Sequence, residues 1–179
     1  MVACGDADGA VTGNTRRFGA SFEKIKQVVD VRKGEIMFGL NMIVHKGRTI
    51  FVGDTSVHEY PTSEQMAEMA ISTARVVRLF GFDPKVAFVS HSTFGQPLTS
   101  RTKHIRSAVE ILKERKVDFE FDGDMQPDVA LNPEYEELYP FAKIVGKANI
   151  LIMPGQHSAA ISYKLIKTIG ETKVIGPLL

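Results

Sequence analysis

The chain has 179 residues, enough for one domain with a sizeable core or for two small lobes. Its 22 basic and 21 acidic residues leave a formal charge of +1, which argues against a nucleic-acid-binding protein and against attachment to a membrane by charge. Its apolar runs are all shorter than the roughly 20 residues that span a bilayer. The single cysteine, Cys4, cannot form an internal disulfide. We therefore expect a soluble, cytoplasmic protein that binds neither nucleic acid nor membrane.

The first 60 residues predict loops, a short helix and a β-hairpin. Residues 1–20 are rich in Gly, Asp, Ala and Thr, as loops are, and Ser21 is a candidate N-cap for an amphipathic helix that follows it. The apolar runs Ile36–Val44 and Thr49–Val52 are separated by a short polar connection containing glycine, which predicts a hairpin. Residues 54–58 then form a polar loop.

From residue 62 onward, strands alternate with helices. Thr62 is a candidate N-cap for a long helix that ends at Gly81, and an acidic turn is expected over residues 121–128. The other predicted elements are a strand at Lys85–Val89, a helix from Ser100, a strand at Val117–Phe121, a short helix from Asn132, a strand at Asn149–Met153, a helix at Ser158–Ile169 and a strand at Lys173–Ile175. This alternation predicts an α/β fold, a layered α/β/α arrangement with a mostly parallel sheet.

The segment around Lys85–Val89 is the strongest candidate for a functional site. Its apolar run is typical of a strand buried on both faces, and the hydroxyl-rich loop Ser90–Gly95 follows at once. Ligands of open α/β sheets bind beyond the carboxyl ends of such strands, and a helix start with free N–H groups suits an anion. The basic residues Arg101, Lys103, His104 and Arg106 favour a phosphate or pyrophosphate. The alternative is a capped helix with a solvated basic face.

Other kinds of site have weaker support. Asp122, Asp124 and Asp128 could be metal ligands, but a plain Asp-Gly turn explains the first pair better. The five histidines lack zinc-site spacing, and the chain has no Gly-x-Ser-x-Gly elbow, no Gly-x-Gly-x-x-Gly and no Walker loop. We therefore predict neither a metal site nor a dinucleotide site in these residues.

Ordered sequence blocks resemble the phosphate acetyl/butyryl transferase family. They are the strand and loop at 86–95, the Asp-Gly-x-x-Gln-x-Asp-x-Ala block at 122–130, the block at 146–154, Tyr163-Lys164, and Ile175-Gly176-Pro177. The chain is still more similar to the phosphotransacetylase-like region at the C-terminal end of bacterial NADP-dependent malic enzymes. That similarity lies in Phe38–Met42, the loop 54–59, Tyr139–Phe141 and the ending 174–179.

The resemblance implies that residues 1–179 are a partial phosphotransacetylase-like domain, an excised piece of a longer protein. It implies a regulatory domain that binds acetyl-CoA and assembles into a homo-oligomer. NADP and a divalent metal would bind only in a catalytic domain, for malate decarboxylation, that these residues do not contain.

Departures from the family pattern favour a domain that binds the ligand over one that transfers the acyl group. Active transferases carry Pro-Asp where this chain has Pro154-Gly155, and Gly-Asn where it has Ala159-Ala160. An arginine of the family is replaced by Lys167-Thr168, and the family's Ser-Arg catalytic loop would fall after Leu179. The alternatives are a working acyltransferase between CoA and phosphate, and a purely structural dimerisation module.

For a CoA or phosphate ligand, we expect a group of loop residues and one cation to form the site, and we assign no catalytic residue. The predicted site residues are Ser90, Ser92, Thr93 and Gly95 around the phosphate end, Arg101 as charge partner, and Gln126 and Asp128 as loop neighbours. Ser92 and Thr93 could instead only cap the helix, and Asp128 could only brace a turn.

Overall fold

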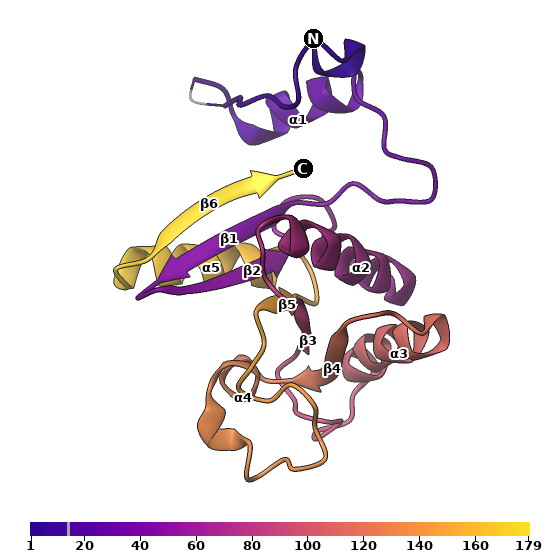
Figure 1. The fold of residues 1–179 in the computed structure, drawn as a ribbon, viewed down its shortest axis with the longest axis vertical. Helices are drawn as coiled ribbons and strands as arrows, with labels where there is room; N and C mark the ends of the chain where they lie inside the picture. The colour runs from indigo at the N-terminus through magenta and orange to yellow at the C-terminus, as the bar shows by residue number, and fades with distance from the viewer. Residues whose placement is uncertain (14) are drawn as a thin grey trace. The chain divides into compact units, whose positions relative to one another are not determined.

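The computed structural model describes residues 1–13 and 15–179, which form two compact units, Met1–Glu35 and Ile36–Leu179 (Figure 1). The first unit holds the short 3-10 helix η1 (Val2–Cys4) and the helix α1 (Phe18–Lys26). The predicted N-cap at Ser21 is wrong: the helix begins one turn earlier, after Arg17, and Ser21 is buried within it. Phe18 and Phe22 stack with ring centroids 5.5 Å apart, so the apolar face extends into that earlier turn.

The second unit contains the α/β fold that the sequence predicts. Its elements are β1 (Leu40–His45), β2 (Arg48–Gly53), α2 (Ser63–Leu79), β3 (Lys85–Val89), α3 (Ser100–Arg115), β4 (Glu120–Met125), α4 (Pro127–Leu131), the 3-10 helix η2 (Pro133–Tyr135), β5 (Ile150–Ile152), α5 (Gln156–Ile169) and β6 (Lys173–Leu178).

Within the described residues, the strands form one six-stranded sheet of order β4-β3-β5-β2-β1-β6. The strands β4, β3, β5 and β2 run parallel, as predicted, whereas β1 is antiparallel to both β2 and β6, so the sheet is mixed. The predicted hairpin is confirmed as β1–β2. Its turn residues Lys46 and Gly47 both have positive φ, the conformation that two-residue hairpin turns require.

Helices cover both faces of the sheet because strand side chains alternate between them. Val86 and Phe88 pack with α2 and α3 in one apolar core, and Ala87 and Val89 pack with α4 and α5 in the other. The predicted α/β/α layering is therefore confirmed, and β3 is buried on both faces. No helix in the described ranges has the length and apolar character needed to cross a membrane.

The helices that border the site begin at side-chain caps. The Thr62 hydroxyl accepts from the Gln65 N–H, and the Gln65 side chain accepts in return from the Thr62 N–H, which confirms the predicted start of α2. Thr99 and Thr102 form the same reciprocal pair at the start of α3. Both helix starts are thereby fixed next to the carboxyl end of the sheet.

The expected acidic turn after Phe121 is wrong. β4 continues through Asp122 and Asp124 to Met125, paired with β3 along its length. Gly123 makes this possible, because a Cβ there would lie 2.8 Å from the Phe88 carbonyl oxygen. The partners that hold the Asp124 carboxylate in place come from the loop after β3, far away in the sequence.

The carboxyl ends of β2, β3 and β5 open onto one edge of the sheet, since these strands run parallel. The helices that connect β2 to β3 and β3 to β4 cover one face, whereas the segments after β4 and β5 pack on the other. The direction of the connections therefore changes between β3 and β5, the kind of position where open α/β sheets bind ligands.

Candidate functional site

The loop after β3 is tied to the neighbouring strand β4 by main-chain hydrogen bonds. The Ser90 N–H donates to the Met125 carbonyl at 2.9 Å, and the Phe94 N–H donates to the Asp124 carbonyl at 2.7 Å. Thr93 and Gln96 exchange main-chain hydrogen bonds of 3.3 and 3.1 Å, which closes a tight turn around Phe94 and Gly95. The loop therefore has a fixed shape.

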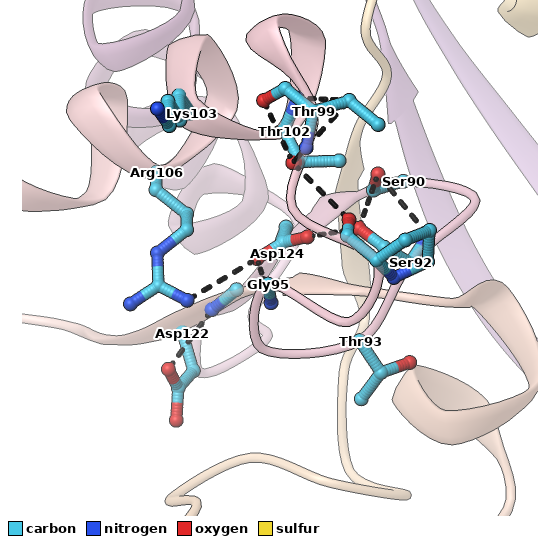
Figure 2. A network of polar contacts seen from close by, with 12 residues as sticks. Ser90, Ser92, Thr93, Gly95, Thr99, Thr102, Lys103, Arg106, Asp122 and Asp124 are labelled. Atoms are coloured by element: carbon cyan, nitrogen blue, oxygen red, sulfur yellow. Dashed lines mark hydrogen bonds and ion pairs between the residues drawn. The ribbon is translucent and has the colours of Figure 1, made fainter.

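The Asp124 carboxylate lies at the centre of the contacts that hold this loop (Figure 2). Its side chain is fully buried, and its carboxylate accepts hydrogen bonds from the Ser92 hydroxyl and, at 3.0 Å, from the Gly95 N–H. The Arg106 guanidinium lies 3.9 Å from the same carboxylate. Ser90 joins through a 3.2 Å contact between its hydroxyl and that of Ser92. A buried carboxylate needs such partners, so this network stabilises the loop conformation.

The sequence did not identify Asp124 as the organiser of this loop. It was considered only as a metal ligand or as part of a turn, because its role depends on partners about 30 residues away. The sequence offered one clue to this role. Asp124 lies in the block at 122–130, which belongs to the same family resemblance as the strand and loop at 86–95.

A cavity of about 520 Å³, the aromatic cavity, lies on one side of the loop. The predicted residues Thr93, Gln126 and Asp128 line it, together with the rings of Phe94, Tyr135, Tyr139 and Phe141. The Thr93 hydroxyl accepts from the Gln126 N–H at 3.3 Å and points away from the Asp124 network (Figure 2).

The hydroxyl of Tyr135 donates to Asp128 Oδ2 at 3.2 Å, at the polar edge of the aromatic cavity. This hydrogen bond and the negative charge of Asp128 raise the pKa of Tyr135 above its ordinary value. The phenol therefore stays protonated near neutral pH and remains a hydrogen-bond donor.

A second cavity of about 880 Å³, the α3 cavity, lies on the other side of the loop. Gly95, Leu98, Lys103 and Arg106 line the part nearest the loop. Phe94 and Gln96 border both cavities, which places the cavities next to each other. The α3 cavity also contains the acidic residues Glu64, Glu110 and Glu114.

The predicted site residues do not form one cluster. Thr93, Gln126 and Asp128 line the aromatic cavity, and Gly95 lines the α3 cavity. Ser90 and Ser92 are buried, with their hydroxyls directed into the Asp124 network. The role of these residues in ligand binding stays a prediction.

Arg101, the predicted charge partner, lies apart from the linings of both cavities. It donates to the Pro154 carbonyl at 3.0 Å, and its guanidinium lies 5.3 Å from the centroid of the Tyr60 ring. It therefore connects α3 to the loop after β5. Lys103 and Arg106 are the cations that border the α3 cavity.

A second buried carboxylate, Asp54, shapes the loop after β2. Its two oxygens accept from the N–H groups of Gly39, Ser56, Val57 and His58, and from His58 Nδ1 at 2.7 Å. Burial raises the pKa of Asp54, but the hydrogen bonds from the His58 side chain and from backbone N–H groups outweigh burial and hold the pKa below its ordinary value. The predicted polar loop is thus a structured feature of the sheet edge.

The loop after β5 packs tightly against the loop after β2. The Met153 N–H donates to the Gly53 carbonyl at 2.7 Å, and the Gln156 N–H donates to the His58 carbonyl at 2.9 Å. Gly155 approaches the Glu59 carbonyl so closely that a Cβ would overlap that oxygen. A larger residue at position 155 would therefore require the loop to move.

The three aspartates considered as metal ligands have protein partners. Asp122 accepts from the Gly123 N–H at 2.9 Å and the Lys143 N–H at 3.2 Å, while Asp124 and Asp128 make the contacts described above. In residues 1–13 and 15–179, no group of three or more His, Cys, Asp or Glu side chains is placed to hold a metal ion.

Comparison with known proteins gives consistent relatives. The family model described as phosphate acetyl/butaryl transferase matches residues 1–179. An NADP-dependent malic enzyme of Rhizobium meliloti is 46% identical over all of this chain, which covers 24% of that protein. The phosphate acetyltransferase of Bacillus subtilis is 30% identical over all of this chain, which covers 56% of that protein. The chain thus spans about a quarter of the length of the malic enzymes it matches.

Solved structures agree with this relationship. A phosphotransacetylase from Streptococcus pyogenes aligns with a TM-score of 0.90 and 29% identity, over 99% of this chain and 55% of its own. The EutD phosphotransacetylase from Staphylococcus aureus aligns with a TM-score of 0.86 and 28% identity, over 99% of this chain and 56% of its own. The chain belongs to the phosphate acetyl/butaryl transferase family.

Proposed function

We propose that the chain is the acetyl-CoA-binding regulatory domain of a longer NADP-dependent malic enzyme, which decarboxylates malate oxidatively to pyruvate. The 46% identity to the Rhizobium meliloti malic enzyme over the whole chain supports this assignment. NADP and a divalent metal would bind in the rest of that protein.

One observation carries the proposal of ligand binding. Residues from two distant segments, Thr93 and Gly95 in one and Gln126 and Asp128 in the other, border adjoining cavities at the carboxyl ends of β3 and β4. Ligands of open α/β sheets bind at this edge. The cavity volumes of about 520 and 880 Å³ lie in the range of small-molecule sites.

Local geometry supports binding without acyl transfer. Active members of the family carry Asp at the position of Gly155, but the Glu59 carbonyl leaves no room here for even a Cβ. The half-buried Ala160 likewise lacks the amide that the family's Asn would supply. Transfer needs a group that takes the thiol proton and donors for the phosphoryl oxygens, and these changes remove two polar groups near the sheet edge.

The alternative function is acyl transfer between CoA and phosphate. It is favoured by the 30% identity to the Bacillus subtilis phosphate acetyltransferase and by Arg106, whose guanidinium lies over Gly95 where it could contact phosphoryl oxygens. A direct assay separates the two functions.

The proposal includes assembly into a homo-oligomer. The helix α5 supports it, because Ile161, Leu165 and Ile169 are spaced four residues apart and their side chains are 65%, 56% and 77% exposed. A stripe of this kind is typical of a helix face that packs against another surface.

The test measures two reactions of the full-length protein. Increasing acetyl-CoA should change the rate of malate decarboxylation in a saturable way, while acetyl-CoA and phosphate together should yield no acetyl phosphate. Robust acetyl phosphate formation would establish the alternative. Absence of both effects would refute both the regulatory function and the transferase.

A further inference from the structure

Three aromatic rings meet on the rim of the aromatic cavity. The ring centroids of Phe94 and Phe141 are 4.9 Å apart at an interplanar angle of 65°, and those of Phe94 and Tyr139 are 5.5 Å apart at 56°. Tyr139 and Phe141 meet edge to face at 6.2 Å. Phe94 comes from the loop after β3, whereas Tyr139 and Phe141 come from the segment between η2 and β5.

The Phe141 side chain is 69% exposed, although it belongs to this cluster. Exposed aromatic faces next to a cavity favour a flat, largely apolar ligand. A small cation enclosed by the rings is less suitable, since the rings already contact one another and leave no gap between them. A planar base can instead lie against the outer face of one ring, as nucleic-acid bases do on aromatic side chains.

The polar groups of the cavity suit the edge of a purine. Tyr135 donates to Asp128 Oδ2, and the exposed Asp128 keeps its other oxygen available for a donor such as an exocyclic amino group. The side-chain amide of Gln126 offers a donor and an acceptor at the same wall. Adenine presents one amino donor and several ring-nitrogen acceptors, which matches this set.

Cations lie on the other side of Phe94 and Gln96. Lys103 and Arg106 border the α3 cavity in the first half of α3. Glu110 and Glu114 lie about 6 and 12 Å further along the helix than Arg106, from a rise of about 1.5 Å per residue. Glu64 belongs to the start of α2, across the cavity. The positive end of the cavity is therefore the end that adjoins the aromatic rings.

We propose that the aromatic cavity binds the adenine base of a nucleotide-bearing carrier, stacked against Phe141, with its phosphates over Gly95 beside Arg106 and Lys103. This inference rests on the proposed function, since CoA consists of such a nucleotide joined to a pantetheine thioester. It assigns an end of the ligand to each cavity. The base lies in the aromatic cavity, and the phosphates cross to the α3 cavity.

The test uses calorimetric titration of the full-length protein with CoA, pantetheine and 3′-phospho-ADP. Phe141→Ala should weaken binding of CoA and 3′-phospho-ADP by about 5- to 150-fold, the range measured for removal of a base-stacking ring. Phe141→Trp should keep the wild-type affinity. Leu138→Ala is the matched control, because Leu138 is 67% exposed in the same segment but lies outside the cavity lining. Pantetheine, which lacks the nucleotide, should bind Phe141→Ala and wild type equally.

The outcomes separate this inference from the proposed function. If wild type binds CoA and Phe141→Ala binds it equally well, the base position is refuted while acyl-CoA binding stands. If wild type binds 3′-phospho-ADP through Phe141 but does not bind CoA, the base site stands and the proposed function fails. If NADP displaces 3′-phospho-ADP and CoA does not, the nucleotide site binds NADP, and CoA is refuted as the ligand of that site.

Discussion

Replacing Asp124 tests whether the buried network holds the site loop. Asp124→Ala removes the acceptor for the Ser92 hydroxyl and for the Gly95 N–H, both inside the protein. Hydrogen bonds to a charged acceptor contribute about 1.5–3 kcal/mol each, so the variant should lose about 3–6 kcal/mol of unfolding free energy. The contact with Arg106 adds at most about 1 kcal/mol, since that side chain is 45% exposed and its charge is screened by water.

Asp124→Asn is the conservative comparison. Its amide oxygen can still accept from the Gly95 N–H, and its NH₂ group can donate to the Ser92 hydroxyl, so both contacts survive without the charge. We expect this variant to lose only about 1.5–3 kcal/mol, because neutral hydrogen bonds contribute roughly half as much as charged ones. Urea unfolding followed by circular dichroism measures both losses. A loss below about 1 kcal/mol for Asp124→Ala would refute the view that this network determines the loop.

The remaining predictions concern the sheet edge, a helix cap, the cations and the assembly. Folding lowers the pKa of Asp54, so its carboxylate stabilises the folded chain above its ordinary pKa of 3.8 and loses that contribution as the pH falls through the folded value. Urea unfolding at a series of pH values should therefore show a constant stability difference between wild type and Asp54→Asn near neutral pH, and a smaller difference below pH 3.8. A stability difference that grows on acidification would contradict this prediction. Thr99→Ala should cost about 0.5–2 kcal/mol in the same assay through loss of the N-cap, and no cost would exclude a stabilising cap. Lys103→Ala should weaken CoA binding more at low than at high salt, whereas Lys116→Ala, at an exposed position at the end of the same helix and outside the cavity lining, should not, and equal effects would remove Lys103 from the site. Leu165→Glu should lower the molar mass measured by light scattering, and an unchanged mass would exclude α5 from the oligomer interface.

Local patterns in the sequence were sufficient for most of the fold. The apolar run at Lys85–Val89 identified a strand buried on both faces, and Thr62 identified the start of α2. These features depend on neighbours within a few residues, which a sequence displays directly. The family resemblance, carried by short ordered blocks, was confirmed by the match over the whole chain.

Features that depend on distant partners could not be predicted in the same way. Asp122 and Asp124 belong to β4 rather than to a turn because pairing with β3 and the hydrogen bonds from Ser92 and Gly95 outweigh the local preference of Asp-Gly for turns. The antiparallel pairing of β6 with β1, which makes the sheet mixed, joins segments more than 120 residues apart.

The contents of the site depend even more on the fold. Phe94 and Phe141 meet only because the segment between η2 and β5 returns to the loop after β3. The charge pattern of α3 suggested an anion site, but helix geometry directs Arg101 toward Pro154 and places Lys103 and Arg106 along the cavity. The sequence indicated an edge of the sheet where two cavities lie, without indicating which side chains line them.

Hydrogen–deuterium exchange of the full-length protein, with and without acetyl-CoA, tests most directly whether this edge of the sheet holds the ligand. The account predicts slower exchange in peptides covering residues 90–99 and 124–141, with little change in α5. Binding of acetyl-CoA with no protection in either of those segments would contradict it.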